Sequence, residues 1–281
     1  MLRNTFCHIP GIGPKSEATL WKRGIRTWDD ASKISTRELP KRNHQFLKSR
    51  ALESITRLEA GDSGYFADNM PAQEMWRMFP EFRDSTVYLD IETTGLAGSE
   101  NTITTIATYD GETILYYVKD HNLESFRRDI EQYRAVVTFN GRCFDVPFIE
   151  KYFGIRMPRA HIDLRFVLKS LGYGGGLKGC EKKLGIDRED LDGVDGFFAV
   201  LLWQDFQHNH NIRSLETLLA YNILDAVNLE TLMVMAYNEK LRKTPFADTH
   251  QLPLPGPVEN LFEADIATVK RIMDLRERYY H

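Results

Sequence analysis

The chain has 281 residues, of which 42% are hydrophobic and 27% are charged, and its formal net charge is −4. This length allows one large domain or two unequal ones, and the composition is typical of a soluble protein with a sizeable core. No stretch approaches the roughly 18 apolar residues of a membrane span. Three scattered cysteines, in no CxxC pair, argue against a disulfide framework or a zinc ribbon. Since residues 1–5 also lack an apolar signal core, we expect a cytoplasmic protein without membrane contact.

The first 60 residues are basic, whereas the remainder of the chain is acidic. Residues 1–60 contain 12 Lys or Arg and 6 Asp or Glu, and the rest contains 24 and 34. We expect residues 1–60 to form a small all-α segment of short helices broken by glycine turns. The basic charge suggests an anionic partner, although the solvated face of a helical segment explains so modest an excess more simply.

A glycine turn precedes the first expected helix. Residues 9–15 read Ile-Pro-Gly-Ile-Gly-Pro-Lys, which resembles the hairpin of a helix-hairpin-helix module. In such a module, backbone N–H groups at a helix N-terminus hold a nucleic-acid phosphate and a lysine assists. The resemblance implies that Gly11 and Gly13 shape the turn and that Lys15 contacts the phosphate. The alternative is a helical segment that only packs on the rest of the protein.

Residues 61–80 are expected to be a linker, and residues 81–240 to be the main domain. Strand patterns with a hairpin turn at Asp110-Gly111 occur at residues 86–91, 102–109, 113–118 and 135–139. A further strand is possible over 161–166. Helices are expected at residues 123–133, 145–153, 178–184, 197–206, 212–220 and 221–239. Residues 241–281 are expected to be a loop and a charged helix, the helix over 258–280.

Three strands in a meander, followed by strands that alternate with helices, predict an α/β fold. We expect a mixed five-stranded sheet flanked by helices. A glycine-rich loop over 172–178 precedes one of the helices, and its Lys178 could contact a phosphate. A mobile connector is the favoured interpretation of that loop.

Three acidic motifs lie far apart on the chain. Asp90 and Glu92 are two residues apart on an expected strand, so both side chains leave the same face. A solvent-facing polar stripe explains such a pair in isolation. Asp145 opens an apolar helix, where it is equally interpretable as an N-cap residue or as a metal ligand.

Tyr221 and Asp225 are four residues apart and therefore lie on one face of an expected helix. Leu218, Leu229 and Leu232 share that face. A carboxylate among leucines costs several kcal/mol unless it is paired or binds a metal. Asp225 is therefore the acid that most strongly indicates a metal site, with oxygen ligands that suit Mg²⁺ or Mn²⁺.

Taken together, the motifs resemble the DEDD superfamily of 3′→5′ exonucleases, which have a ribonuclease H-like fold. Asp90, Glu92, Asp145 and Asp225 match the four acids, and the Tyr-x-x-x-Asp spacing resembles the tyrosine (DEDDy) branch. Within the superfamily the chain is most similar to the YprB-type proteins, over about residues 80–240. The similarity includes residues 90–96, 140–149, 161–164, 177–186 and 218–229.

The resemblance implies a metal-dependent 3′→5′ exonuclease that holds two Mg²⁺ or Mn²⁺ ions and acts on DNA or RNA. Asp90, Glu92 and Asp225 would hold one ion, and Asp145 would act through water on the second. Tyr221 would orient the attacking water. The side chains implied to contact a single-stranded 3′ end are Thr93, Thr94, Leu96 and Asn140. The alternatives are a non-catalytic nucleic-acid-binding or scaffold protein on the same fold, and an endonuclease.

Overall fold

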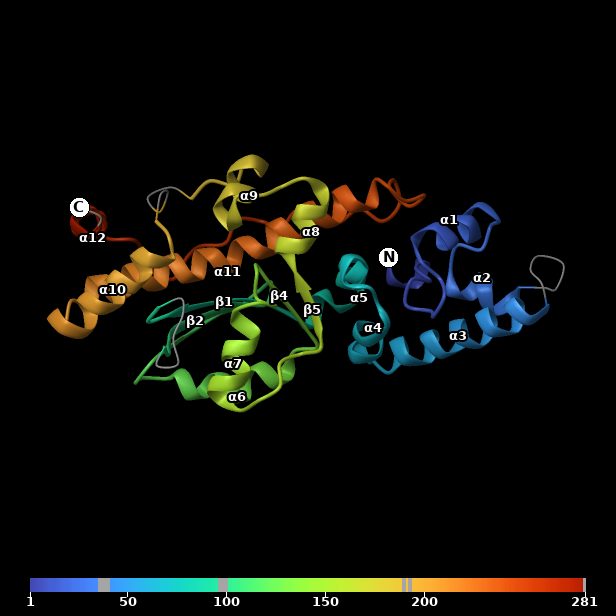
Figure 1. The fold of residues 1–281 in the computed structure, drawn as a ribbon, viewed down its shortest axis with the longest axis horizontal. Coiled ribbons are helices and arrows are strands. Elements are labelled where there is room, and N and C mark those ends of the chain that lie inside the picture. The colour runs from blue at the N-terminus through green and yellow to red at the C-terminus, as the bar shows by residue number, and fades with distance from the viewer. Residues whose placement is uncertain (35–40, 96–100, 189–190, 192–193, 280–281) are drawn as a thin grey trace.

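The computed structural model describes residues 1–34, 41–95, 101–188, 191 and 194–279. A five-stranded sheet with the strand order β3-β2-β1-β4-β5 forms its centre (Figure 1). The strands are β1 (Thr86–Thr93), β2 (Ile103–Tyr109), β3 (Ile114–Val118), β4 (Ala135–Thr138) and β5 (Ala160–Asp163). β1, β2 and β3 pair antiparallel, whereas β1 pairs with β4 and β4 with β5 in parallel. The predicted mixed five-stranded α/β fold is therefore confirmed.

The central strand β1 separates an apolar face from the face that carries the acids. Val87, Leu89 and Ile91 are buried in a cluster with side chains of α6 (Phe126–Asp129) and α7 (Asp145–Phe153). Tyr88 faces the opposite way and packs in the cluster that contains Leu229. Because successive side chains of a strand alternate, Asp90 and Glu92 share the face of Tyr88. The register between β1 and β2 shifts after Glu92, where the strand approaches its end.

The longest helix, α11 (Ile212–Leu241), covers that second face and contacts β1, β2 and β4 (Figure 1). Two separate helices were expected over 212–220 and 221–239, which is wrong because no glycine or proline interrupts the segment. By length and composition α11 could cross a membrane, but 78% of its most apolar window is buried inside the protein. Such burial is typical of the core helix of a globular domain.

The possible strand over 161–166 is only partly observed. β5 ends at Asp163, and α8 (Leu164–Leu171) begins at the next residue. The Asp163 carboxylate accepts a hydrogen bond from the Arg165 N–H at 3.0 Å. This helix cap sets the boundary between β5 and α8, because it satisfies a backbone N–H in the first turn of the helix. The strand pattern in the sequence does not indicate this hydrogen bond.

The remaining helices follow the expected order with shifted ends. The helix expected over 123–133 is a series of short turns, η4 (Leu123–Ser125), α6 and η5 (Ile130–Gln132). α9 (Gly176–Leu184) and α10 (Gly196–Asn209) precede α11. The terminal helix α12 (Ile266–Tyr279) starts eight residues later than the expected 258.

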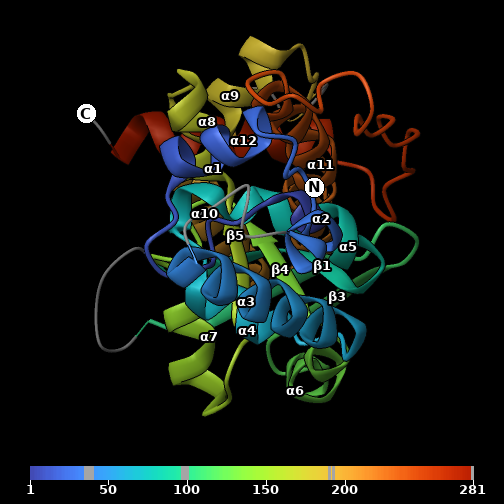
Figure 2. The same cartoon turned by 90° about the vertical axis from the view of Figure 1, so that its right-hand side faces the viewer.

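The N-terminal segment contains η1 (Leu2–Asn4), α1 (Pro14–Lys22), α2 (Trp28–Lys33) and α3 (Lys41–Glu59). Residues 61–80 are largely helical and form α4 (Ser63–Asn69), η2 (Ala72–Met78) and the start of α5 (Phe79–Phe82), which η3 (Arg83–Ser85) follows. Figures 1 and 2 show α4 and α5 between the sheet and helices α1–α3. Buried Arg77 joins these segments, since it pairs with Glu17 of α1 at 2.6 Å and with Glu74 at 2.7 Å.

Candidate metal centre and active site

Three of the four acids converge where α11 crosses β1. Asp90 and Glu92 project from the strand, and Asp225 projects from the helix. One carboxylate oxygen from each lies within 4.8 Å of the other two. Asp225 lies 133 positions after Glu92 and 135 after Asp90 on the chain, so only the packing of α11 against β1 brings it to the other two acids. The spacing suits a divalent cation held by hard oxygen ligands.

Asp145 lies beside this group as the first residue of α7. The helix N-cap is Phe144, so Asp145 is not the capping residue. Burial raises the pKa of Asp145 to about 7, while backbone N–H groups of Asp145 and Ile91 act in the opposite direction. Because Ile91 lies between Asp90 and Glu92, this contact places the Asp145 carboxylate against the acid-bearing end of β1.

The acids repel one another, and burial increases the cost of their charge. Burial raises the pKa of Asp90 well above its ordinary value, and the charges of Asp225, Glu92 and Asp145 raise it further. The pKa of Glu92 is also raised by burial and by Asp225, although nearby Lys178 opposes this shift. A bound cation would remove this repulsion, because it favours the ionised form of every carboxylate around it.

A buried arginine already neutralises part of the cluster. Arg188 is 5% exposed and donates from Nη2 to the Oδ1 atom of Asp225. Its Nη1 donates to Glu181 Oε2 at 2.7 Å, and Asn228 donates to the other oxygen of Glu181 at 2.8 Å. Arg188 lies in a loop after α9, where no periodic pattern marks a buried position. Sequence reasoning therefore missed both Arg188 and Glu181.

Tyr221 lies one helical turn before Asp225 and is 4% exposed. Lys178 donates to the Tyr221 hydroxyl at 3.0 Å, and its ammonium group lies 4.6 Å from the ring centroid. Burial raises the pKa of Tyr221 far above its ordinary value, and the charges of Asp225 and Glu92 act in the same direction. A hydroxyl that keeps its proton at neutral pH is suited to orient a water molecule rather than to act as a general base.

Asn222 is a third side chain of the site that was not predicted from the sequence. It is fully buried, and its amide donates to Asp90 Oδ2 at 2.7 Å. Its position next to Tyr221 in the third acidic motif was the available signal. Since ligand carboxylates in metal sites are commonly oriented by such hydrogen bonds, Asn222 can fix the direction of Asp90.

Of the side chains implied to bind substrate, Thr93 and Thr94 lie at the end of β1 and in the turn after it, and Asn140 lies in the turn after β4. The Thr93 hydroxyl donates to the Gly95 carbonyl at 2.8 Å, and the Thr94 hydroxyl accepts from the Thr102 N–H at 3.1 Å. Both hydroxyls thus shape the turn after β1. Leu96 lies outside the described residues. Asn140 has a left-handed backbone (φ 67°), and its N–H donates to Asp163 at 2.8 Å.

The residues of the N-terminal hairpin belong to a different element. Gly11 has a left-handed φ of 81°, which favours glycine, and Gly13 is the N-cap of α1. Lys15 is exposed on the first turn of α1. All three residues therefore lie at the start of α1 or in the turn before it, whereas the acids lie on β1, α7 and α11. Their contact with nucleic acid stays a prediction.

A model of the RNase H superfamily matches residues 87–237, a segment that contains Tyr221 and all four acids. No curated protein and no solved structure matches the chain.

Proposed function

The chain belongs to the RNase H superfamily, and from this premise we propose that it is a metal-dependent 3′→5′ exonuclease. The superfamily and the acidic cluster indicate a nuclease that acts on nucleic acid. We assign the chain to the tyrosine branch of the DEDD enzymes and to its YprB-like group. One observation carries this proposal. Asp90, Glu92 and Asp225 meet within 4.8 Å, and a buried tyrosine lies one turn before Asp225.

The residues present fit Mg²⁺ or Mn²⁺. The donors are hard carboxylate oxygens, and their mutual repulsion calls for a cation. Among the described residues, the hydrogen bonds of Asn222 and Arg188 use Oδ2 of Asp90 and Oδ1 of Asp225. The other oxygen of each carboxylate can therefore bind metal. Two ions, when bound, would polarise the phosphate and supply a nucleophilic water at neutral pH.

The side chains of the protein would position the reactants. Asp90, Glu92 and Asp225 would hold one ion, and Asp145 would act near a second. Tyr221 would orient the attacking water through its protonated hydroxyl, because its pKa is far above neutral. Asn222 would keep Asp90 in a fixed orientation through the bond at 2.7 Å. Positioning of this kind is a large part of catalysis in phosphoryl transfer.

The substrate would be the 3′ end of a single strand of DNA or RNA. Thr93, Thr94 and Leu96 would line the terminal nucleotide, and Asn140 would contact the strand. We further propose a division into residues 1–60, a linker over 61–80, a nuclease domain over 81–240 and a C-terminal part over 241–281. Residues 1–60 would add sequence-independent contacts through Gly11, Gly13 and Lys15. The location would be cytoplasmic.

Degradation of labelled strands tests this proposal. Single-stranded DNA and RNA carrying a 5′ label are incubated with the full chain and Mn²⁺, and the products are sized over time. The proposal expects a ladder of labelled products that shorten progressively from the 3′ end. A strand with a blocked 3′ end should persist. Internal cleavage of the blocked strand would indicate an endonuclease instead.

The matched control is Asp225→Asn, which keeps the shape of the side chain but removes a ligand charge. This variant should still bind the strand but should not degrade it. Undiminished Mn²⁺-dependent cleavage by the variant would contradict the assignment, because the proposed metal site depends on Asp225.

A second candidate is a nucleic-acid-binding protein without activity. The contact of Arg188 with Asp225 favours it, because a guanidinium group already neutralises this proposed ligand. Calorimetric titration with Mn²⁺ separates the two candidates. The nuclease should bind Mn²⁺ and lose that binding in Asp225→Asn, whereas the binding protein should not take up the metal.

A further inference from the structure

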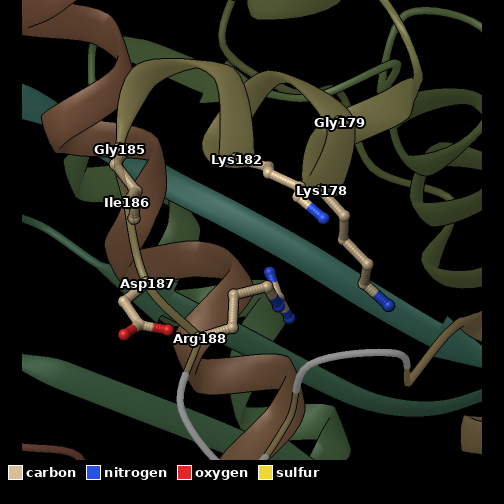
Figure 3. Close-up of a pocket in the computed structure, with 7 residues that line it drawn as sticks. All are labelled: Lys178, Gly179, Lys182, Gly185, Ile186, Asp187 and Arg188. Atoms are coloured by element: carbon tan, nitrogen blue, oxygen red, sulfur yellow. The ribbon is translucent and has the colours of Figure 1, made fainter.

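A cavity of about 450 Å³ adjoins the acidic cluster on the side of α9. Lys178, Lys182, Ile186, Asp187 and Arg188 line it together with two glycines (Figure 3). We call it the α9 pocket. Two of its lining residues contact the candidate active site, because Lys178 donates to the Tyr221 hydroxyl and Arg188 donates to Asp225.

The local sequence explains why basic side chains gather there. Lys178 and Lys182 are four residues apart on α9, so they lie on one face of the helix. The helix ends at Gly185, whose left-handed φ of 77° turns the chain back. This turn returns Arg188 to the same face of α9. Gly179 lies between the two lysines in the sequence and adds no side chain to the wall of the α9 pocket.

The polar ends of these side chains suit an anion. Figure 3 shows the nitrogen ends of Lys178, Lys182 and Arg188 directed into one space, whereas the carboxylate of Asp187 points away from it. Arg188 is 95% buried, and its Nε–H has no hydrogen-bond partner among the described residues. The Nε atom is completely buried, so the ammonium groups of Lys178 and Lys182 are the donors that face the pocket.

We propose that the α9 pocket binds a backbone phosphate of the nucleic-acid strand whose end lies at the acidic cluster. This inference rests on the proposed function and adds a phosphate site to it. The four acids repel a polyanionic strand, and the exposed ammonium group of Lys182 supplies an attraction next to them. Lys178 adds a second ammonium group. Arg188 adds no net charge to the pocket, because Glu181 and Asp225 already neutralise it.

Lys182→Gln tests the pocket with the least risk to folding. Lys182 is exposed, and the structure gives it no ion pair within the described ranges. Lys183→Gln is the matched control, because it removes the same charge from the same helix. Lys183 does not line the pocket, and its ammonium group contacts the Gly174 carbonyl at 2.9 Å.

Binding is measured by fluorescence anisotropy of a labelled single strand in EDTA, so that no cleavage occurs. The salt concentration is varied from about 50 to about 200 mM. Lys182→Gln should weaken binding several-fold and reduce the slope of log K against log salt by about 0.7 to 1. Lys183→Gln should match the unmodified chain in both quantities. An affinity and a slope unchanged in Lys182→Gln would overturn the inference.

Competition distinguishes the sources of the phosphate. Inorganic phosphate and a nucleoside 5′-monophosphate are each titrated against the bound strand. If Lys182→Gln weakens the binding of the monophosphate but not the binding of the strand, the pocket holds a released product. The assignment to a phosphate of the strand would then be wrong. Weaker strand binding by Lys182→Gln supports the assignment to a phosphate of the strand, whether or not the small ligands compete.

The proposed function and the pocket fail in different ways. Cleavage by the unmodified chain, together with unchanged binding by Lys182→Gln, would refute the pocket and leave the nuclease intact. Strand binding that depends on Lys182, without any Mn²⁺-dependent cleavage, would support the phosphate site and refute the nuclease.

Discussion

Replacement of Arg188 by Met should destabilise the protein strongly when no metal is bound. The guanidinium group satisfies two carboxylates, Glu181 and Asp225, whose side chains are 0% and 6% exposed. Removing one partner of a buried ion pair costs about 3–5 kcal/mol, because the remaining charge stays buried. Asn228 still bonds Glu181, and Lys178 still lies near Asp225, so the lower end of this range applies. A loss of about 3 kcal/mol corresponds to a fall in Tm of about 6–12 °C.

Thermal melting followed by circular dichroism measures this loss in EDTA and in Mn²⁺. The metal should raise the Tm of Arg188→Met by more than it raises that of the unmodified chain, because the cation replaces the missing positive charge. The control is Arg128→Met. Arg128 is 83% exposed and pairs with Asp129 on the surface, so its loss should cost less than about 1 kcal/mol.

Two results would refute the conclusion that Arg188 stabilises the buried carboxylates in place of a metal. The first is a Tm in EDTA that matches the unmodified chain, which would mean that Arg188 does not stabilise the acids. The second is a smaller gain from Mn²⁺ in Arg188→Met than in the unmodified chain. That outcome would mean that Arg188 helps to assemble the metal site rather than to substitute for the metal.

Three further predictions concern individual side chains. Asn222→Ala should lower Mn²⁺ affinity by about 10–100-fold in calorimetry, because Asp90 loses its orienting bond; unchanged affinity would contradict this. Tyr221→Phe should lower kcat and leave the pH profile unchanged, since the hydroxyl stays protonated; a shifted profile would assign it an acid–base role. Burial lowers the pKa of His8 to about 4, so its stabilising contribution is full above about pH 6.5 and falls as the pH drops toward 4. Between pH 7 and pH 5, the Tm of His8→Gln should therefore fall less than the Tm of the unmodified chain. An equal fall would exclude His8 as the cause of the lower stability at pH 5.

Much of the sheet was predictable because its signals are local. β1 alternates apolar and acidic side chains, and the predicted turn between β2 and β3 is observed one residue later than expected. The Asp110 N–H donates to the Thr113 carbonyl at 3.3 Å, so Gly111 (φ 99°) and Glu112 form its centre in place of Asp110 and Gly111. Spacing along one element also identified which acids share a face. The boundary between β5 and α8 was missed, because the Asp163 cap outweighs the strand pattern that follows it.

The partners of the acids could not be predicted, because they depend on contacts between distant segments. Arg188 lies 37 positions from Asp225 and is brought to it by the turn at Gly185. In the sequence, Glu181 resembles one more charged residue on a lysine-rich helix. Only the packing of α9 against α11 shows that Glu181 is completely buried and needs a cation.

Burial gives the basic side chains around the acids different responses to salt. Arg188 is buried with its two carboxylates, so dissolved ions screen this contact little. Lys182 is exposed, and its attraction for a phosphate is screened beyond about 10 Å at 0.1 M salt. We therefore expect rising salt to weaken strand binding while the Tm difference between Arg188→Met and the unmodified chain stays nearly constant. If rising salt reduced the strand affinity and the Tm difference to a similar extent, Arg188 would be hydrated in solution. Its contacts with Glu181 and Asp225 would then behave as surface ion pairs.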